Sequence, residues 1–566
     1  MTEVAFRGHP AAPGAALGPA WTRVDSDDPA PGDIDEECAR VERGLALVVV
    51  ELETLATRLR SEGHDADADI VEANRMMADD PALVTAARAA VAGGETARRA
   101  IADAAAPHIA ALANLDDPTL ASRAADLRAI ARRAGELANG DGVAPPAGAI
   151  VLAEDLGPSE VASWAGQIAG IVLAQSGATA HAAIVARSLG IPLVTGVGAP
   201  ALRIPDGEQI AVDADRGLVL RNFSPATRVR FRGRIERARS EAERALSERH
   251  EPSVTRDGRA VRLLANAGTR AEVDAALEAG ADGIGLLRTE LAFLDATDWP
   301  DEESHRRALA PLLAPLSHRI ATVRTLDFGG DKTPPFLAGT DSASPLGRRG
   351  IRLSLSSPCG VAPQLRALLA VAGDAVVRIL IPMISEVDEV DAVREIARAA
   401  RDDIVPGGPD PLVGAMIEIP AAALNASAIA RRCDFLSVGT NDLIQYTLAT
   451  DRQDHAASAR AVAYHPAVLR LIARAVTAAH SAGIPVDVCG EAAGDAETLP
   501  LLVGLGVDEL SVSPARLAPT RRMIRALTLS RARAATAEAL SATNAEDVAR
   551  IARAALDPPG SDERRE

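Results

Sequence analysis

The chain has 566 residues, of which 48% are hydrophobic and only 2% aromatic, so it is long enough for three or four domains with substantial cores. Its formal charge of −18, from 60 Lys and Arg against 78 Asp and Glu, argues against nucleic acid or an anionic membrane as a general partner. Four widely spaced cysteines without a CxxC pair suggest neither a disulfide framework nor a zinc site, and no apolar run is long enough for a membrane span. We therefore expect a cytoplasmic globular protein without direct membrane insertion.

The N-terminal third of the chain alternates between two kinds of pattern. The first 20 residues contain Pro and Gly too often for a helix and predict strands and turns. From about 33 to 143, apolar residues recur at helical spacing, and Asp79–Pro81 and Asp116–Pro118 mark two helix starts. Short apolar runs return over 147–222, which is typical of a small α/β domain. Because the first 20 residues share that character, we expect the helical region to be an insert in this domain.

One histidine of the small α/β domain is a candidate for chemistry. His181 lies in SGATAHAAIVARSLG, between a small-residue turn and a segment of helical character, directly after the apolar run 168–174. A strand that ends in such a turn and opens a helix leaves backbone N–H groups that favour an anion beside the imidazole. His181 is therefore a candidate phosphoryl acceptor, which Ser176 and Thr179 would assist. The alternative is a structural histidine bonded through one ring nitrogen.

The second half of the chain has a regular strand and helix alternation. Residues 223–252 include a charged, helix-favouring run and predict a solvated linker helix. After it we count eight strand candidates, at 261–268, 283–288, 321–329, 376–383, 412–420, 434–442, 484–491 and 508–514. Eight strand-then-helix units in about 270 residues predict a TIM barrel, (β/α)8.

Polar residues gather at the C-terminal ends of these strand candidates, which face one mouth when all strands of a barrel are parallel. They are Arg288, Thr289 and Glu290 at the second strand, Asp327, Asp331 and Lys332 after the third, Glu418 at the fifth, Asn441 and Asp442 at the sixth, and Cys489, Gly490 and Glu491 at the seventh. Together they predict a single site at the barrel mouth.

The charges at this mouth indicate the kind of ligand. Arg288, Arg324 and Arg349, with Lys332, form a cationic set suited to a small ligand with phosphate and carboxylate groups, because guanidinium grips both bidentately. Glu418 and Asp442 supply hard oxygens that favour Mg²⁺, which would take its other ligands from water and substrate. A salt-bridge network among the same residues is the structural alternative.

The motifs then resemble a known family. GATAHAAIVARSLGIP, ADGIGLLRTE, VRTLDFGGDK, RGIR, GAMIEIPAAAL, SVGTNDLIQYTLATDR and VCGEAAGD, in this order and spacing, resemble Enzyme I of the bacterial phosphoenolpyruvate:sugar phosphotransferase system. The resemblance covers essentially the whole chain. It implies phosphoryl transfer from phosphoenolpyruvate to His181 and then to a histidine of the phosphocarrier protein HPr, with release of pyruvate, as the first step of sugar uptake.

The resemblance also implies roles for single residues by motif position. Those implied to hold the substrate phosphate and carboxylate are Arg288, Arg324, Arg349 and Arg452, assisted by Lys332 and Asn441, while Glu418 and Asp442 are implied as Mg²⁺ ligands. Cys489 matches the cysteine that would protonate the enolate carbon as pyruvate leaves; the alternative is a cysteine that only packs. Arg349 is preferred to Arg348, although the loop DSASPLGRRGIR is one residue shorter near Ser344 than the family pattern.

The expected architecture is multidomain α/β. Its parts are a swivelling phosphohistidine domain (1–20 and 147–222), a helical HPr-docking domain (21–146), a linker helix (223–255), a TIM barrel that binds phosphoenolpyruvate and by resemblance forms a homodimer (256–540), and a tail (541–566). Three other functions share parts of this pattern. Pyruvate phosphate dikinase or phosphoenolpyruvate synthase needs an ATP-binding domain for which this sequence has no room, a nitrogen-related Enzyme I paralogue normally carries an extra N-terminal domain, and a non-catalytic relative would have lost the acceptor or a metal ligand.

Overall fold

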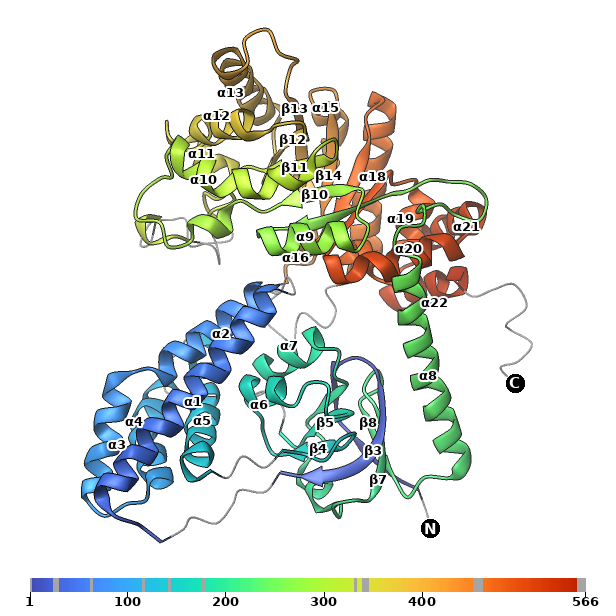
Figure 1. Ribbon diagram of the computed structural model, residues 1–566. Helices are drawn as coiled ribbons and strands as arrows, with labels where there is room; N and C mark the ends of the chain where they lie inside the picture. Colours follow the sequence, from blue (N-terminus) through green and yellow to red (C-terminus); the bar gives the residue numbers. More distant parts are fainter. Residues whose placement is uncertain are drawn as a thin grey trace. The chain divides into compact units, whose positions relative to one another are not determined.

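The computed structural model describes residues 3–23, 30–61, 65–113, 118–140, 144–175, 180–329, 333–337, 346–450 and 462–556. The chain forms two compact units, residues 1–241 and 242–566 (Figure 1). Within the ranges described, no helix combines the length and apolarity needed to cross a bilayer. All four cysteines are free thiols, and the multidomain α/β class is confirmed.

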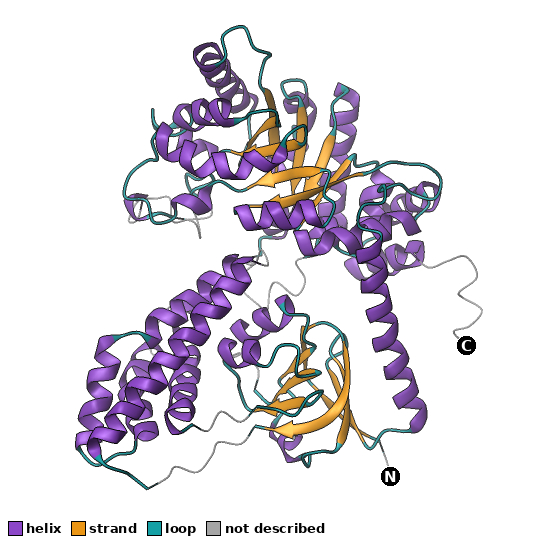
Figure 2. Ribbon diagram, viewed as in Figure 1, coloured by secondary structure: helices purple, strands orange, loops and turns teal. Residues whose placement is uncertain are grey.

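The first unit contains an eight-stranded sheet in the order β1-β8-β7-β3-β4-β5-β6-β2. Its strands are β1 (Val4–Arg7), β2 (His9–Ala12), β3 (Ala15–Thr22), β4 (Ile150–Ala153), β5 (Gly170–Leu173), β6 (Leu193–Thr195), β7 (Gln209–Asp213) and β8 (Leu218–Arg221). Strand β3 pairs parallel with β4 and antiparallel with β7, so the N-terminal segment does complete the sheet (Figure 2). Along β4, Ile150 and Val151 enter different buried clusters, because both faces of the sheet are covered.

Helices make up the insert between β3 and β4, as predicted. They are α1 (Ile34–Ser61), α2 (Asp65–Ala78), α3 (Pro81–Ala92), α4 (Ala97–Ala113) and α5 (Pro118–Asn139), and the sheet part adds α6 (Pro158–Ser163) and α7 (Ala180–Ser188). Helix α3 begins at the predicted position, because the Asp80 carboxylate caps it by accepting the N–H of Ala82 at 2.8 Å.

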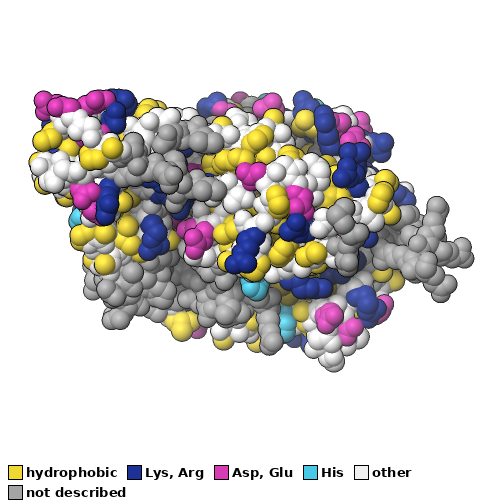
Figure 3. Space-filling model, turned by 90° about the horizontal axis from the view of Figure 1, so that it is seen from below, with side chains coloured by type: hydrophobic (Ala, Val, Ile, Leu, Met, Phe, Trp, Pro, Cys, Tyr) yellow, Lys and Arg dark blue, Asp and Glu magenta, His cyan; other side chains and the backbone are white. Residues whose placement is uncertain are grey.

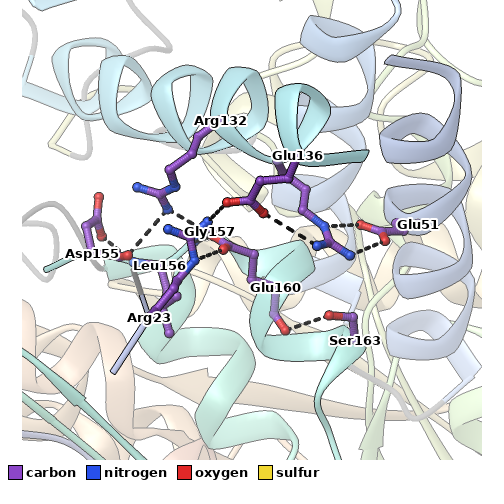
Figure 4. A network of polar contacts seen from close by, with 10 residues as sticks. Arg23, Glu51, Arg132, Glu136, Asp155, Leu156, Gly157, Glu160 and Ser163 are labelled. Carbon is purple, nitrogen blue, oxygen red and sulfur yellow. Dashed lines mark hydrogen bonds and ion pairs between the residues drawn. The ribbon is translucent and has the colours of Figure 1, made fainter. Parts of the chain in front are cut away.

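A buried ionic network joins the helical insert to the sheet part within the first unit (Figure 4). Arg23, directly after β3, pairs with Glu160 of α6 at 2.7 Å and with Glu136 of α5. Arg132 of α5 also pairs with Glu160, at 3.0 Å. Glu160 is fully buried, so its two arginine partners and the N–H of Gly157 compensate the loss of its hydration.

The predicted linker is a single long helix, α8 (Pro225–Ser247). Most of its described side chains are exposed, which agrees with a solvated helix. Phe231 is buried against Ala211 and Leu220 of the sheet, and Arg234 pairs with Asp213 at 2.7 Å. The division between the two units falls within this helix.

The second unit contains a closed barrel of eight parallel strands, and each predicted strand is present (Figures 1 and 2). They are β9 (Arg262–Ala267), β10 (Gly283–Leu287), β11 (Ile320–Arg324), β12 (Val376–Ile381), β13 (Leu412–Ile417), β14 (Phe435–Gly439), β15 (Val486–Cys489) and β16 (Glu509–Val512). Every strand pairs in parallel with both neighbours, and β9 and β16 close the ring. The TIM barrel prediction is confirmed.

Helices surround this barrel. They are α9 (Arg270–Glu278), α10 (Glu302–Leu313), α11 (Ile351–Leu355), α12 (Ala362–Val371), α13 (Val387–Ile404), α14 (Pro420–Leu424), α15 (Ala426–Ala430), α16 (Thr440–Leu448), α18 (Pro466–Ala482), α19 (Leu499–Leu505), α20 (Leu517–Ala526), α21 (Leu529–Ser541) and α22 (Ala545–Leu556). Helix α22 lies in the segment designated as the tail, and its Val548 and Ile551 pack with Leu469 and Leu501.

Two sets of side chains fill the barrel unit. Outward-facing residues such as Val488 and Leu510 form the large core under the helices. Inward-facing residues form a small apolar cluster of Leu286, Leu380, Met416, Phe435 and Cys489. Among the residues drawn in colour, basic and acidic side chains are mixed on the face in Figure 3.

Candidate active site

The carboxyl ends of the barrel strands bring the predicted polar residues to one mouth. Arg324 and Cys489 are the last residues of β11 and β15. Glu418 follows β13 directly, and Asp442 lies in the first turn of α16, which begins where β14 ends. All four are at least nine-tenths buried, so the site lies within the mouth rather than on its rim.

Two buried arginines and their carboxylate partners form a continuous ionic network. Arg349 pairs with Asp442 and with Asp327, each at 3.1 Å. Arg324 shares Asp327, at 3.2 Å, and pairs with Glu290. Burial acts to lower the pKa of both guanidiniums, but the attraction of Asp327 and its neighbouring carboxylates outweighs it, so their pKa is raised. Both arginines therefore stay charged.

Glu418 has the most perturbed carboxylate near this network. It is 1% exposed and accepts the N–H of Met383 at 2.6 Å. Burial, followed by repulsion from Asp442 and Asp327, raises its pKa to about 8. A Cβ at position 439 would lie 2.9 Å from Glu418 Oε2, so a side chain there would displace this carboxyl group. The space beside the backbone of residue 439 is therefore filled by the Glu418 carboxyl group.

Four carboxyl groups gather around the two buried arginines in the described part of the mouth. They belong to Glu290, Asp327, Glu418 and Asp442. Repulsion between two carboxyl groups is what a divalent cation would relieve, and Mg²⁺ commonly binds one or two carboxylates while keeping substrate and water ligands. In the ranges described, no three His, Cys, Asp or Glu side chains gather into a complete protein cage. Glu418 and Asp442 therefore fit Mg²⁺ of this open kind.

Cys489 is a fully buried thiol at the end of β15. Its Sγ lies 3.3 Å from Ser437 Oγ and donates to the carbonyl of Val438 at 3.6 Å. Burial raises its pKa well above the ordinary value, against the opposing effect of Ser437. The sulfur is therefore a protonated thiol at neutral pH, which suits a proton donor and not a nucleophile.

The remaining predicted residues lie around this core. Arg288 is half-buried directly after β10, and its guanidinium pairs with no carboxylate in the part of the chain that the structure describes. Asn441 accepts the N–H of Glu491 through its Oδ1 at 3.4 Å. Arg348 is exposed whereas Arg349 is buried, which agrees with the choice of Arg349 for the site.

Several predicted residues lie outside what is described. Asp331, Lys332 and Arg452, and Ser176 and Thr179 of the first unit, fall between the described ranges. His181 is the second residue of α7, and its side chain is also outside the description. The backbone around it agrees with the predicted pattern, since β5 ends at Leu173 and a helix opens at Ala180. His181 belongs to the first unit and the arginine network to the second.

Sequence reasoning missed two side chains that touch the network. Tyr446 accepts a hydrogen bond from Arg349 Nη1 at 3.2 Å. It lies one turn after Asp442 on α16, so helical spacing would have put it on the same face. Gln364 of α12 donates to Thr289 at 2.9 Å and accepts the N–H of Leu326 at 3.0 Å. Nothing local in the sequence links Gln364 to the strand ends that it braces.

Comparisons with known proteins agree with this fold. Residues 242–529 match the family model of the PEP-utilising enzyme, PEP-binding domain, residues 7–123 match the N-terminal model, and residues 145–217 match the mobile domain. The fold and the site thus define a phosphoenolpyruvate-utilising enzyme.

Curated relatives narrow this class. The chain is 35% identical over 566 residues to the phosphoenolpyruvate-protein phosphotransferase of Geobacillus stearothermophilus, covering 97% of each chain. It is 34% identical to the enzyme of the same name from Bacillus subtilis (strain 168), over 91% of this chain and 92% of that one. A multiphosphoryl transfer protein of Rhodobacter capsulatus is 37% identical, and the match spans 88% of this chain but 61% of that longer relative. The chain belongs to the phosphoenolpyruvate-protein phosphotransferase (Enzyme I) family.

Proposed function

We propose that this protein transfers the phosphoryl group of phosphoenolpyruvate to His181 and then to a histidine of a phosphocarrier protein, HPr, releasing pyruvate as the first step of sugar phosphotransfer. The observation that carries the proposal is the convergence of two buried arginines, a carboxylate pair suited to Mg²⁺ and a buried thiol at one barrel mouth. Family membership supports the reaction.

The arginines would hold the substrate. Phosphoenolpyruvate carries a phosphate and a carboxylate, and guanidinium binds both through paired N–H groups. Arg324 and Arg349 would exchange part of their bonding to Asp327 for these groups, and the half-buried Arg288 is available without breaking an ion pair among the described residues. Lys332, Asn441 and Arg452 are proposed to assist on motif position alone.

Glu418 and Asp442 would hold Mg²⁺. When bound, the ion would neutralise charge on the transferred phosphoryl group. The protein's own contribution is to bury the carboxylates beside Arg349, which already contacts Asp442 at 3.1 Å, and so to keep the cationic groups close to the anionic substrate. Phosphoryl transfer relies mainly on such positioning and electrostatic stabilisation.

Cys489 would protonate the enolate carbon after the phosphoryl group has left. A general acid must carry its proton at the working pH, and the raised pKa of the buried thiol meets that condition. The Sγ–H bond breaks as a C–H bond forms on the product, which leaves as pyruvate.

His181 would supply the nucleophile as a neutral imidazole, which is the main form above an ordinary pKa of about 6.5. Since it belongs to a different compact unit from the arginine network, transfer requires the phosphohistidine domain to move between the barrel and HPr. We propose a swivel about the connections near residues 20, 145 and 225. Distances between labels on the sheet part and the barrel should change through the phosphorylation cycle; fixed distances would contradict the swivel.

Labelling with radioactive phosphoenolpyruvate and Mg²⁺ tests the acceptor. The wild-type protein should gain acid-labile, base-stable label, and His181→Ala should gain none. The control His108→Ala removes an exposed histidine of α4 and should label normally. Persistent label in His181→Ala would reject the assignment.

Two further measurements test the metal and the proton donor. Chelation of Mg²⁺, or the change Glu418→Ala, should abolish labelling, and retained labelling would reject the metal site. Cys489→Ala should slow pyruvate formation while His181 still accepts phosphate, and an undiminished rate would assign the thiol to packing.

The predictions of a dimer and of HPr as the partner rest on the resemblance. We propose a homodimer through the barrel and a location in the cytoplasm, and the five-part division of the chain into domains stays a prediction. Sedimentation of the full chain over a range of concentrations would test the dimer, since a monomer throughout would contradict it. Phosphoryl transfer to purified HPr, compared with a nitrogen-related phosphocarrier, would separate the two Enzyme I branches.

A further inference from the structure

A buried carboxyl group lies inside the barrel below the thiol. Asp487 precedes Cys489 by two residues on β15, so the alternation of a strand turns both side chains to the same, inward face. In the sheet register Asp487 is opposite Ser437 of β14 on one side and Glu509 of β16 on the other. Asp487, Ser437 and Cys489 are thus neighbours in the barrel interior.

Among the residues that the structure describes, little stabilises a negative charge on Asp487. Its residue is 4% exposed, and neither carboxyl oxygen has a hydrogen-bond partner in the described part of the chain. The hydroxyl of Ser437 lies beside it, but the geometry falls short of a formed hydrogen bond. An ionised carboxylate here would be an uncompensated buried charge, which is strongly unfavourable.

The nearest cations are already engaged by another carboxylate. Arg378 of β12 donates to Glu509 at 2.7 Å and lies over the ring of Phe435 at 5.3 Å. Arg262 of β9 also pairs with Glu509. Burial raises the pKa of Asp487 well above its ordinary value, with a further rise from Glu509 that the effects of Ser437 and Arg378 oppose. Asp487 is therefore a neutral carboxylic acid that holds a proton.

Ser437 connects this proton to the thiol. Its Oγ lies 3.3 Å from Cys489 Sγ, and the thiol has no exposed surface. A thiolate formed at this position has no exposed surface, so the groups packed against it are the nearest source of a replacement proton. A hydroxyl passes a proton by accepting one hydrogen bond and donating another. Ser437 contacts the thiol and is opposite Asp487 in the sheet register, although its hydroxyl forms no hydrogen bond to the carboxyl group in this structure.

We propose that Asp487 is a proton reserve that restores the Cys489 thiol through Ser437 after each turnover. The inference rests on the proposed role of Cys489 as proton donor. The Sγ–H bond breaks as the C–H bond of pyruvate forms, and the thiolate takes the proton of Ser437 Oγ. Ser437 takes the carboxyl proton of Asp487, and water returns a proton to Asp487 when the product has left.

The direction of this transfer follows from ordinary acid strengths. A thiol has a pKa of about 8.5 and a carboxyl group one of about 3.9 in water, and burial raises both in this barrel. The thiolate is therefore the stronger base and draws the proton away from Asp487. Asp487 does not touch the substrate and acts only through Ser437.

The test uses Asp487→Asn, which keeps the shape of the side chain but holds no transferable acid proton. In this variant the first equivalent of pyruvate per protein should form at the wild-type rate, because the thiol starts protonated. Later turnovers, in the presence of HPr and excess phosphoenolpyruvate, should slow by at least about tenfold. Steady-state turnover at the wild-type rate would overturn the proposal.

Ser437→Ala interrupts the same path without touching the carboxyl group and should give the same rapid first turnover and slow steady state. It also serves if Asp487→Asn does not fold. The matched control is Ser511→Ala, which removes the hydroxyl opposite Cys489 on β16, where Oγ donates to Asn266 at 2.7 Å instead. Equal slowing in Ser511→Ala would overturn the proposal, because the effect would then come from barrel packing.

Infrared spectroscopy gives a readout that a packing role would not move. The wild-type protein at neutral pH should show the C=O stretch of a protonated carboxylic acid that Asp487→Asn lacks, and its absence in the wild type would overturn the proposal. Labelling of His181 keeps the two hypotheses apart. If the wild type does not label, the proposed function fails; if it labels and Asp487→Asn turns over normally, only the proton reserve fails.

Discussion

Two adjacent arginines offer a sharp test of the site, because they have the same side chain but differ in burial and in their partners. Arg349 is 2% exposed and donates to Asp442, Asp327 and Tyr446, whereas Arg348 is exposed. The changes Arg349→Met and Arg348→Met each remove one guanidinium and keep an unbranched side chain. Any difference between the variants therefore reports the position and not the chemistry of the substitution.

The magnitude follows from the partners that each arginine leaves behind. Without Arg349, the buried Asp442 loses its cation and Asp327 keeps only Arg324, and breaking a buried ion pair from one side costs about 3–5 kcal/mol. The unfolding entropy is about 2.1 cal/mol/K per residue, which amounts to about 0.7 kcal/mol per degree for the unit of residues 242–566. A loss of about 0.7 kcal/mol in unfolding free energy therefore lowers the unfolding midpoint by about one degree. The midpoint of its transition should fall by about 4–7 °C. Arg348→Met should change stability by less than about 0.5 kcal/mol.

Calorimetry of the barrel transition and the rate of His181 labelling are the two assays. Arg349→Met should label at least about 100-fold more slowly, because a charged donor to the phosphoryl group is lost. Arg349→Lys should recover part of the stability but less of the rate, since an ammonium cannot bind bidentately. Loss of labelling in Arg348→Met with a normal Arg349→Met would refute this description of the site.

Three further predictions concern single positions. Burial lowers the pKa of His305 to about 4, so its imidazole stays neutral in the folded protein at a pH where the unfolded chain, with a histidine pKa of about 6.5, binds a proton. This difference stabilises the fold fully above pH 6.5, and up to about 3 kcal/mol of stability should be lost as the pH falls from 6.5 to 4. Thermal unfolding of His305→Leu over this pH range should not show that loss. Equal acid sensitivity of the wild type and the variant would contradict the reasoning. Asp80→Ala should destabilise the first unit by about 1 kcal/mol in urea unfolding because α3 loses its cap, and a change no larger than in Asp79→Ala would count against the cap. Gly439→Ala keeps an allowed backbone but puts a Cβ 2.9 Å from Glu418 Oε2, so labelling should need about tenfold more Mg²⁺; an unaltered Mg²⁺ requirement would show that Glu418 is not a ligand.

The barrel was predictable because its eight apolar runs are separated by clear turns, yet the predicted strand ends ran too far. The third strand was expected over 321–329 but β11 ends at Arg324. Leu326 and Phe328 are apolar and buried, but they pack in a cluster with Phe293 and Leu353 under the loops. Apolarity predicts burial, and burial alone does not distinguish a strand from a loop that folds over the barrel mouth.

The residues of the site could be predicted from the sequence more readily than the ion pairs between them. The position of Glu418 and Asp442 at strand ends follows from strand order, whereas the pairing of Arg349 with Asp442 joins residues 93 positions apart. Such a pairing depends on where the chain before α11 places Arg349, and no local pattern encodes it. For the same reason the sequence left Arg348 and Arg349 as alternatives that only burial separates.

The inside of the barrel was overlooked although its signal is local. In Val486, Asp487, Val488 and Cys489, alternate residues are apolar, and the two valines face the helices. The other face must then point into the barrel, which makes Asp487 a buried carboxyl group two residues below the thiol. Residues at the strand ends are the ones that would contact a substrate. Side chains inside a barrel are stacked in layers, and the layer below the strand ends affects the protonation of the groups above it. Alternation along a strand is therefore evidence about chemistry as well as fold.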